Sequence, residues 1–331
     1  MSEHEIRHNK ASGDWVIFAP ARGKRPQDFR QDQDSAPLPE HDPHCPFCPG
    51  NEEQLPGIVL QMDGDPNGWN TRVVPNKFAA LSRTADTRRY DVGMYTAMPG
   101  YGVHEVIIEH PQHNQDMATL PLDDVALVIE TYHKRYTQLM QEHKNMLPLI
   151  FRNHGARAGT SLIHPHSQLI VTGFVPNHIR HREEEAQRYY DHYGRCVFCD
   201  ILEFEQSAAL RIVYENSSFV AFVPFAADVP FEVWILPKAH EADFGSITDP
   251  QKRDLAEALK TVLSRIHNKL NDPDYNYIIN TSARYKADEP QLHWYVQIRP
   301  RLTTRAGFEI GSGISINPSI PEEDAQFLRQ T

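Results

Sequence analysis

Residues 153–171 read Asn-His-Gly-Ala-Arg-Ala-Gly-Thr-Ser-Leu-Ile-His-Pro-His-Ser-Gln-Leu-Ile-Val, a glycine-rich loop that leads into an apolar strand. Side chains alternate between the two faces of a strand, so His164, His166 and Gln168 share one face. Two imidazoles and one amide on a single face predict that the chemistry of the protein takes place there.

The loop ahead of these residues runs from Gly155 through Gly159 to Ser161. Its small residues allow backbone N–H groups to approach phosphate oxygens, and Ser161 adds a hydroxyl. An ordinary glycine turn is the alternative interpretation.

Length and charge restrict the class of protein. A chain of 331 residues suits two modules and has ample length to bury a core. The net charge of -11 and the lack of a basic run argue against a nucleic-acid partner. The polar start and the absence of about 18 to 20 consecutive apolar residues predict a cytoplasmic protein without a membrane segment.

The four cysteines form two pairs, Cys45-Pro-Phe-Cys48 and Cys196-Val-Phe-Cys199. In a reducing compartment this pattern favours thiolate metal sites over disulfides.

The cysteine pairs open two copies of a weak duplication, found when residues 45–175 are compared with 196–302. Each copy continues with strands, one long amphipathic helix and a further strand that carries a histidine. The paired segments are strands 72–78 and 211–216, strands 105–113 and 232–240 that end at histidines, and helices beginning near Leu122 and Asp249. A charged helix over 178–193 joins the copies.

Each copy supplies a Cys2His2 set, which is a donor set typical of tetrahedral zinc. The two predicted sets are Cys45, Cys48, His113 and His164, and Cys196, Cys199, His240 and His293. Four protein ligands leave no open position, so we expect two structural Zn²⁺ sites. For any one histidine the alternative is an ordinary hydrogen-bonded side chain.

The two copies differ at one informative position: His166 corresponds to Tyr295 in the second copy. A scaffolding role would be shared by both copies, whereas a chemical role need not be. Neutral imidazole attacks phosphorus without a general base, so we expect His166 to accept a nucleotide from a nucleotide diphosphate. Gln168 would then hydrogen-bond the phosphoryl oxygens.

Two arginines, Arg22 and Arg25, lie in a loop bounded by proline and glycine. They have two open interpretations, a phosphate clamp and a plain surface loop.

The sequence resembles the galactose-1-phosphate uridylyltransferase family, the nucleotidyltransferase branch of the histidine-triad superfamily. The most specific match is Asn153…Gly155…Gly159-x-Ser161…His164-Pro165-His166-x-Gln168, and Arg22–Pro26, Asn76–Phe78 and the first cysteine pair also match. The resemblance implies an α+β fold of two related histidine-triad-like halves around an antiparallel sheet with flanking helices. The expected boundaries are 1–177 for the catalytic half, 178–195 for a connecting helix and 196–331 for a half with a degenerate site.

The resemblance also implies a ping-pong exchange in carbohydrate metabolism. A nucleotide sugar would transfer its nucleotide to His166, and a second sugar 1-phosphate would collect it. Gln168 and Ser161 would contact the transferred group, with Gly159 beside them, while Asn153, Arg22, Arg25 and Asn76 would hold the nucleotide sugar. Some of these residues would come from the partner subunit of a homodimer with shared active sites.

Two reactions are consistent with this resemblance. The leading interpretation is exchange between UDP-glucose and galactose 1-phosphate. The second cysteine pair and Ser167 are similar to features of ADP-glucose phosphorylases, which transfer AMP to inorganic phosphate. A non-enzymatic zinc-ribbon module is the alternative from another class, and the wide ligand spacing and the acidic charge argue against it.

Overall fold

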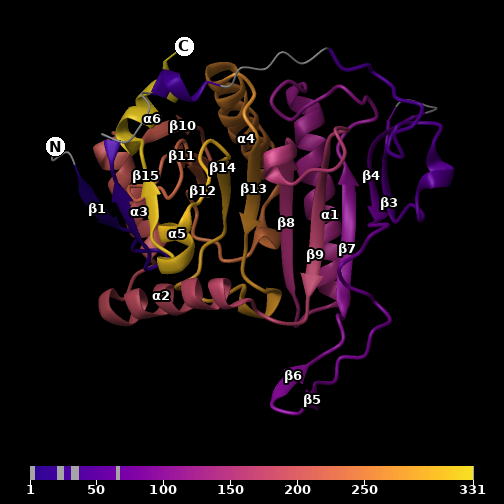
Figure 1. Ribbon diagram of the computed structural model, residues 1–331, viewed down its shortest axis with the longest axis horizontal. Helices are drawn as coiled ribbons and strands as arrows, with labels where there is room; N and C mark the ends of the chain where they lie inside the picture. The colour runs from indigo at the N-terminus through magenta and orange to yellow at the C-terminus, as the bar shows by residue number, and fades with distance from the viewer. Residues whose placement is uncertain (1–3, 21–25, 31–36, 65–67, 331) are drawn as a thin grey trace.

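The computed structural model describes residues 4–20, 26–30, 37–64 and 68–330. Within these ranges its centre is a ten-stranded sheet in which every strand runs antiparallel to its neighbours (Figure 1). The strand order is β10-β11-β12-β14-β13-β8-β9-β7-β4-β3. In the first half the strands are β3 (Leu60–Asp63), β4 (Trp69–Pro75), β7 (Gly102–Ile108), β8 (Leu147–His154) and β9 (His166–Thr172). In the second half they are β10 (Ile212–Glu215), β11 (Phe219–Phe222), β12 (Val233–Pro237), β13 (Tyr275–Asn280) and β14 (Tyr295–Pro300).

The strand order is symmetric about the contact between β8 and β13. One row of paired residues crosses the centre of the sheet: Gln168 pairs with Phe151, Phe151 with Ile278, and Ile278 with Gln297. The row therefore places Gln168 and Gln297 at equivalent positions on either side of the seam. The two halves expected from the sequence are thus two copies of one strand arrangement, and the α+β prediction is confirmed.

Helices α1 (Leu122–Glu142) and α4 (Asp249–Leu270) pack against each other and cover one face of the sheet. The apolar side of each strand faces them, so Leu169 and Val171 of β9 are fully buried in the main core. The start of α4 is fixed by Gln251, whose side-chain oxygen accepts the backbone N–H of Thr248 at 2.8 Å. Because side chains alternate, His166 and Gln168 lie on the opposite face of β9.

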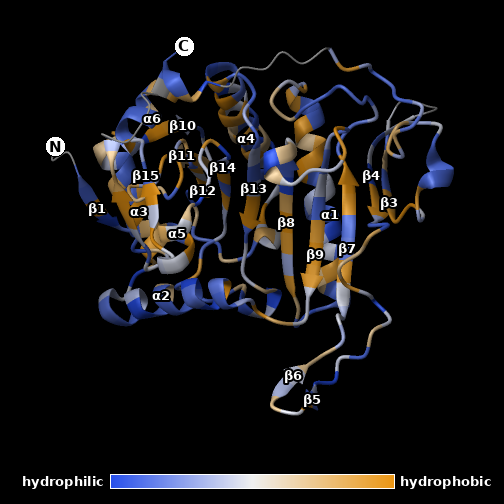
Figure 2. Cartoon of the chain, viewed as in Figure 1, coloured by the Kyte–Doolittle hydropathy of each residue, from blue (hydrophilic) through white to orange (hydrophobic). Residues whose placement is uncertain are grey.

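Helix α2 (Asn177–Tyr193) crosses one end of the sheet and joins the two halves (Figure 1). Figure 2 shows that this helix is mainly hydrophilic, whereas the strands are mainly hydrophobic. Helix α3 (Val197–Ala208) follows and covers the outer face of the second half with its apolar residues.

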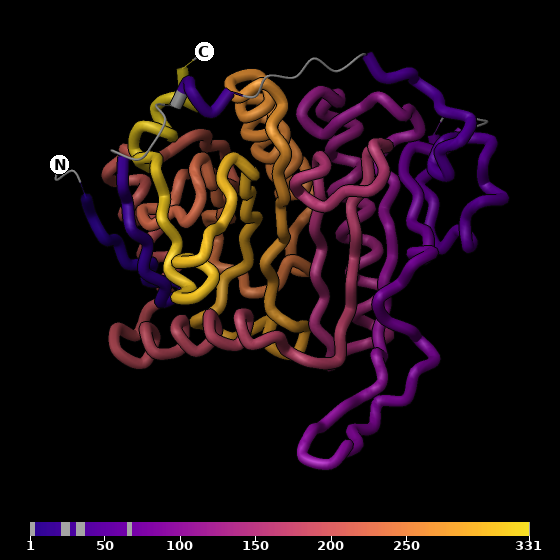
Figure 3. Tube along the Cα trace, in the orientation of Figure 1, coloured from indigo at the N-terminus to yellow at the C-terminus, as the bar shows by residue number. Residues whose placement is uncertain are grey.

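The two ends of the chain meet in a small sheet in which β2 lies between β1 and β15. Its strands are β1 (Glu5–His8), β2 (Trp15–Phe18) and β15 (Ser315–Asn317). The short helices α5 (Gly307–Ser312) and α6 (Pro321–Arg329) flank β15 along the chain. At the other side of the molecule the hairpin of β5 (Tyr90–Val92) and β6 (Tyr95–Ala97) projects away from the body (Figure 3). None of the helices within the described ranges is long and apolar enough to span a bilayer.

The expected strands over 105–113 and 232–240 end earlier than predicted. Strand β7 ends at Ile108 and β12 ends at Pro237, so His113 and His240 lie in the loops beyond. Proline has no N–H to donate to a sheet: Pro237 is the last paired residue of β12, and Pro111 lies between the end of β7 and His113.

Candidate active site and metal clusters

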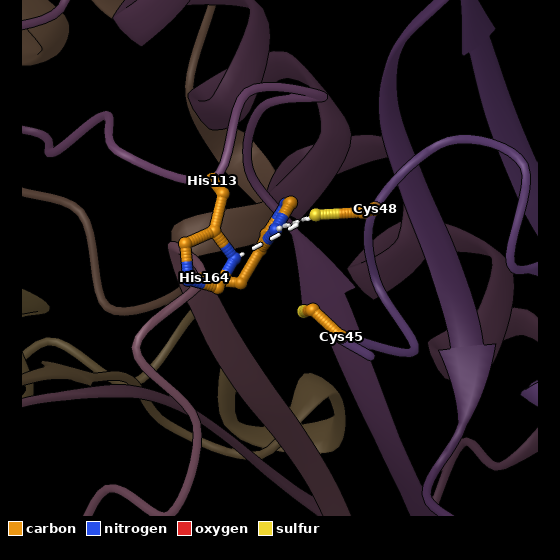
Figure 4. Close-up of side chains that lie close together, drawn as sticks. All are labelled: Cys45, Cys48, His113 and His164. Atoms are coloured by element: carbon orange, nitrogen blue, oxygen red, sulfur yellow. Dashed lines mark hydrogen bonds between the residues drawn. The ribbon is translucent and has the colours of Figure 1, made fainter. Parts of the chain in front are cut away.

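The first Cys2His2 set gathers at one end of β7 and β9 (Figure 4). The ligand atoms of Cys45, Cys48, His113 and His164 all lie within 4.8 Å of one another, and all four residues are buried. Cys48 Sγ lies 3.6 Å from Nδ1 of His113 and 3.6 Å from Nδ1 of His164. Zn–S and Zn–N bonds of about 2.3 and 2.0 Å place tetrahedral ligands about 3.5 Å apart, so the donor set fits zinc.

Burial and hydrogen bonding around this cluster affect the protonation states of its ligands, which decide whether they can bind a metal ion. Burial lowers the pKa of His164 to about 4, so the ring is neutral at pH 7. Its Nε2–H donates to the carbonyl of His110 at 2.8 Å, which leaves the Nδ1 lone pair facing the cysteines. Burial also raises the pKa of the Cys45 thiol to about 11, so a bound dication is needed to hold it as a thiolate at neutral pH.

The second set, Cys196, Cys199, His240 and His293, forms an equivalent cluster. Cys199 Sγ lies 3.3 Å from Nδ1 of His240 and 3.7 Å from Nδ1 of His293, whose Nε2 contacts the carbonyl of Pro237 at 3.1 Å. The second cluster is more accessible than the first, because His240 is exposed and Cys199 is only partly buried. It also differs in local structure, since Cys196 precedes the first residue of helix α3.

His166 is held in one orientation beside the first cluster. Its Nδ1–H donates to the carbonyl of His164 at 2.8 Å, and the ring of Phe47 packs edge-on at 5.4 Å between centroids. Burial lowers the pKa of His166, so the ring is neutral and Nε2 keeps its lone pair. The imidazole is 8% exposed and lines a cavity of about 440 Å³.

Gln168 lines the same cavity and is positioned by His104, a residue that the sequence analysis missed. The backbone N–H of Ala80 donates to His104 Nδ1 at 3.1 Å, so the proton of the ring is on Nε2. That Nε2–H donates to Gln168 Oε1 at 2.8 Å. The amide nitrogen of Gln168 is therefore the end that is oriented to donate to an oxygen in the cavity. The only sequence signal for His104 was its position on the same strand face as Val106.

The other expected substrate residues fall into three groups. Asn76, Gly159 and Ser161 line the cavity with His166 and Gln168. Asn153 lies at the side of the glycine loop and accepts a hydrogen bond from Asn276 at 2.8 Å, outside the cavity lining. Arg22 and Arg25 lie outside the described residues. Apolar walls complete the cavity, including Phe47, Leu55, Val74, Phe78, Val106 and Leu162.

The glycine loop requires glycine at two positions. Gly155 has φ +82° and Gly159 has φ +91°. Residues other than glycine rarely adopt these backbone conformations. A Cβ added at Gly155 would lie 2.0 Å from Oδ1 of Asp274. The other oxygen of this carboxylate, Oδ2, accepts a hydrogen bond from the backbone N–H of Arg157 at 2.5 Å. The loop is thus fixed against β13 by a carboxylate from the second half.

A buried polar network lies under β9, on the helix side of the sheet, and it too was missed. Arg152 Nε donates to Glu109 at 3.0 Å, and the hydroxyls of Tyr132 and Ser167 donate to the same carboxylate. Ser167 follows His166 directly, so this network anchors the strand that carries it. Glu109, Arg152 and Tyr132 lie in separate segments of the chain, and nothing in the sequence indicated that they meet.

In the second half the position equivalent to His166 holds a buried tyrosine whose hydroxyl is already hydrogen-bonded. Tyr295 is 4% exposed, and its hydroxyl accepts a hydrogen bond from Arg182 at 3.0 Å. Burial raises the pKa of Tyr295, so the phenol stays protonated at neutral pH.

Comparison with known proteins identifies the family. Models of the galactose-1-phosphate uridyl transferase N-terminal and C-terminal domains match residues 1–176 and 182–311. The chain is 38% identical to an ADP-glucose phosphorylase of Arabidopsis thaliana, over 98% of this chain and 92% of that protein. It is 28% identical to the galactose-1-phosphate uridylyltransferase of Thermotoga maritima, over 99% of this chain and 98% of that protein.

Solved structures agree with the sequence matches. The crystal structure of an ADP-glucose phosphorylase from Arabidopsis thaliana with bound ADP-glucose superposes with a TM-score of 0.84, at 35% identity and 99% coverage of both chains. A structure described as uridylyltransferase gives a TM-score of 0.76 at 27% identity, over 98% of this chain and 97% of that one. Two family models that together span most of the sequence, and a relative that matches almost its full length, show that this chain is a nucleotidyltransferase that belongs to the galactose-1-phosphate uridyl transferase family.

Proposed function

We propose that the chain is a hexose-1-phosphate nucleotidylyltransferase that works through a covalent nucleotidyl adduct on His166. The observation that carries this proposal is the orientation and protonation of the His166 imidazole. Its Nδ1 is engaged by the His164 carbonyl, and the ring lines a cavity large enough for a nucleotide sugar fragment. The free lone pair on Nε2 is a nucleophile toward phosphorus that needs no general base.

In the first half-reaction Nε2 of His166 attacks the α-phosphorus of the nucleotide sugar. The N–P bond forms, the P–O bond to the sugar phosphate breaks, and sugar 1-phosphate leaves with the electron pair. In the second half-reaction an anionic oxygen of the acceptor phosphate attacks the same phosphorus, and the N–P bond breaks. Two displacements give net retention of configuration at phosphorus.

Gln168 and Ser161 are proposed to stabilise the charge on the transferred phosphoryl oxygens. The amide of Gln168 is oriented by His104, which supports a donor role. Gly159 and Asn76 line the same cavity and are proposed to contact the nucleotide. Asn153 is proposed to act from beside the glycine loop, and Arg22 and Arg25 are proposed to hold the phosphates of the nucleotide sugar.

The leading reaction is exchange between UDP-glucose and galactose 1-phosphate. A second candidate, transfer of AMP from ADP-glucose to inorganic phosphate, is favoured by the 38% identity to an ADP-glucose phosphorylase. Both acceptors present a phosphate oxygen that is already ionised at pH 7, so the same residues serve either reaction.

We propose that both clusters hold structural Zn²⁺. Four protein donors per cluster and burial of the first set support this role over water activation. The metal would fix the loop of Cys45, the loop of His113 and the start of β9 relative to one another. We further propose a homodimer with shared active sites, located in the cytoplasm, where a reducing environment suits the four free cysteines.

The test is to incubate the protein separately with UDP-glucose and with ADP-glucose, without acceptor, and to map the adduct by mass spectrometry of the His166 peptide. We expect labelling by one of the two nucleotides, which also identifies the base. His166→Ala should abolish the adduct and keep the metal content, whereas His192→Ala, at an exposed position on α2, should label normally. Labelling by neither nucleotide, or an adduct on another side chain, would refute the proposal.

A further inference from the structure

A buried amide of the second half, that of Asn276, lies beside the glycine loop of the first half. Asn276 is 7% exposed and pairs with Asn153 across the contact between β13 and β8. Its Nδ2 donates to Oδ1 of Asn153 at 2.8 Å and to the backbone carbonyl of Ala158 at 2.9 Å. Its Oδ1 accepts a hydrogen bond from Nε of Arg301 at 2.5 Å.

These partners determine the orientation of the Asn276 amide. A guanidinium group only donates hydrogen bonds, and a backbone carbonyl only accepts them. Arg301 therefore faces the oxygen of Asn276, and the carbonyl of Ala158 faces its nitrogen. The second N–H of this nitrogen needs an acceptor, so Asn153 presents Oδ1 to Asn276.

The amide nitrogen of Asn153 is consequently directed toward the glycine loop. It lies 4.0 Å from the point that a Cβ would occupy at Gly159, and no other atom lies so close to that point. Within the described residues no hydrogen bond uses this nitrogen. Gly159 lines the cavity with His166, so its lack of a side chain leaves the space between Asn153 and the cavity open.

The backbone around Arg301 is fixed to the same part of the second half. The N–H of Arg301 donates to the carbonyl of Asp274 at 2.7 Å. The carboxylate of Asp274 in turn accepts the backbone N–H of Arg157 in the glycine loop at 2.5 Å. The loop and the Asn276 amide are thus held from one place beside β13.

We propose that Asn276 and Arg301 are positioning residues for the transfer reaction. They hold Asn153 so that its amide nitrogen donates to an anionic oxygen of the bound nucleotide diphosphate. In the opposite orientation Oδ1 of Asn153 would face the phosphate, and two acceptors repel each other. This inference rests on the proposed function, because it assigns the cavity around His166 to a nucleotide.

Asn276→Asp tests the proposal because it removes the donors and keeps the shape. The carboxylate still accepts from Arg301 but has no N–H for Asn153, whose amide should turn its nitrogen toward position 276 and its oxygen toward the cavity. Isothermal titration calorimetry of the full-length chain with UDP and with ADP measures nucleotide binding without transfer. We expect the dissociation constant to rise roughly tenfold or more. Asn268→Asp, at an exposed position on α4, should bind like the parent.

A double-mutant cycle with Asn153→Ala separates positioning from structural support. If Asn276 acts through Asn153, Asn276→Asp should weaken binding no further once Asn153 is alanine. A purely structural role would leave the effect of Asn276→Asp intact in that background. That result, or parent-like binding by Asn276→Asp alone, would overturn the proposal. Thermal unfolding verifies that each variant folds.

Arg301→Met, at an exposed residue, carries the same test if Asn276→Asp does not fold. We expect nucleotide binding to weaken, and Arg301→Lys should restore part of it because an ammonium group also only donates. The effect of Arg301→Met should disappear in the Asn153→Ala background. An effect that persists there would show direct attraction between Arg301 and the nucleotide and would overturn the positioning role. Arg253→Met, at an exposed position on α4, is the matched control.

Adduct formation on His166 with UDP-glucose and with ADP-glucose, measured on the same samples, reports on the transfer reaction separately. A parent protein that forms no adduct, but whose variants show the expected pattern of nucleotide binding, would overturn the transfer reaction alone. A parent that forms the adduct while Asn276→Asp and Arg301→Met bind nucleotide equally well would overturn the positioning role alone. A parent that binds neither nucleotide and forms no adduct would overturn both.

Discussion

The backbone carbonyl of His164 accepts a hydrogen bond from Nδ1 of His166 at 2.8 Å, while the ring of His164 belongs to the first Cys2His2 cluster. One residue therefore serves both the cluster and the orientation of the proposed nucleophile. If the cluster loses its metal and His164 moves, the His164 carbonyl that orients His166 moves with it. Metal content and adduct formation on His166 should therefore be linked.

Cys45→Ser tests this link. We expect loss of one metal equivalent and of several kcal/mol of stability, on the order of the contribution of structural zinc sites. Adduct formation should fall with it, because the start of β9 loses its anchor. Elemental analysis, thermal unfolding and mass spectrometry of the adduct give the three readouts, and Cys196→Ser, which removes the equivalent ligand of the second cluster, is the matched control. Full metal content in Cys45→Ser would show that the ligand assignment is wrong.

The two clusters should release metal in a fixed order. His240 is exposed and Cys199 is partly buried, whereas all four residues of the first set are buried. We therefore expect a chelator such as EDTA to remove one equivalent quickly and the other slowly, with adduct formation retained after the first loss. A colorimetric zinc indicator follows the release, and Cys196→Ser should eliminate only the fast phase. A fast phase that persists in this variant would contradict the assignment.

Gly155→Ala should destabilise the loop beside the cavity. The residue has φ +82°, and the new Cβ would meet the Asp274 carboxylate that binds the Arg157 N–H. We expect a loss of about 1–3 kcal/mol and slower adduct formation, measured by denaturant unfolding and by mass spectrometry. Gly311→Ala is the control, since its Cβ would have open space in helix α5. Equal stability of the two variants would contradict this account of the loop.

The stability of the chain should depend on pH through Asp324. This carboxyl is fully buried, accepts the Phe231 N–H at 3.0 Å, and is also hydrogen-bonded to Ser319. Burial raises the pKa of Asp324 from 3.8 to about 7. Between about pH 4 and 7 the unfolded chain has released this proton while the folded chain retains it, so stability falls as pH rises through that window.

Asp324→Asn removes this dependence. An amide has no proton to lose and still offers an oxygen to Phe231, so the variant should gain stability relative to the parent as pH rises from about 4 to 7. The full effect is on the order of 4 kcal/mol, from about three pKa units. Urea unfolding at several pH values measures it, with Asp123→Asn at an exposed position as control. A parallel pH profile for Asp324→Asn and the parent would refute the prediction.

The arrangement of the strands could be predicted from the sequence, but most of the polar contacts that position the site residues could not. The repeated Cys-x-x-Cys pairs and histidines could be aligned because each copy carries them in the same order, and the fold does bring each set of four together. His104, Glu109 and Arg152 could not be found in this way. Their roles depend on partners from other strands, such as Gln168, and one sequence does not reveal which distant polar residues will meet.

The residues at which strands β7 and β12 end could not be predicted from the sequence pattern either. The histidines at 113 and 240 appeared to terminate strands, yet pairing stops before them near Pro111 and at Pro237. The loops that result allow these imidazoles to turn toward the cysteines, which a position within a strand would not permit. The contact expected between Asn153 and the nucleotide sugar stays a prediction; the structure shows that Oδ1 of Asn153 accepts a hydrogen bond from Asn276, a residue of the opposite half.

The contact between β8 and β13 has a consequence for how the protein can be divided. Five residue pairs join these strands at the middle of the sheet. If either half were produced alone, it would present a bare backbone edge of unsatisfied donors and acceptors, the kind of surface that promotes aggregation. Neither half is therefore expected to be self-sufficient, even though each carries its own Cys2His2 cluster and its own cavity.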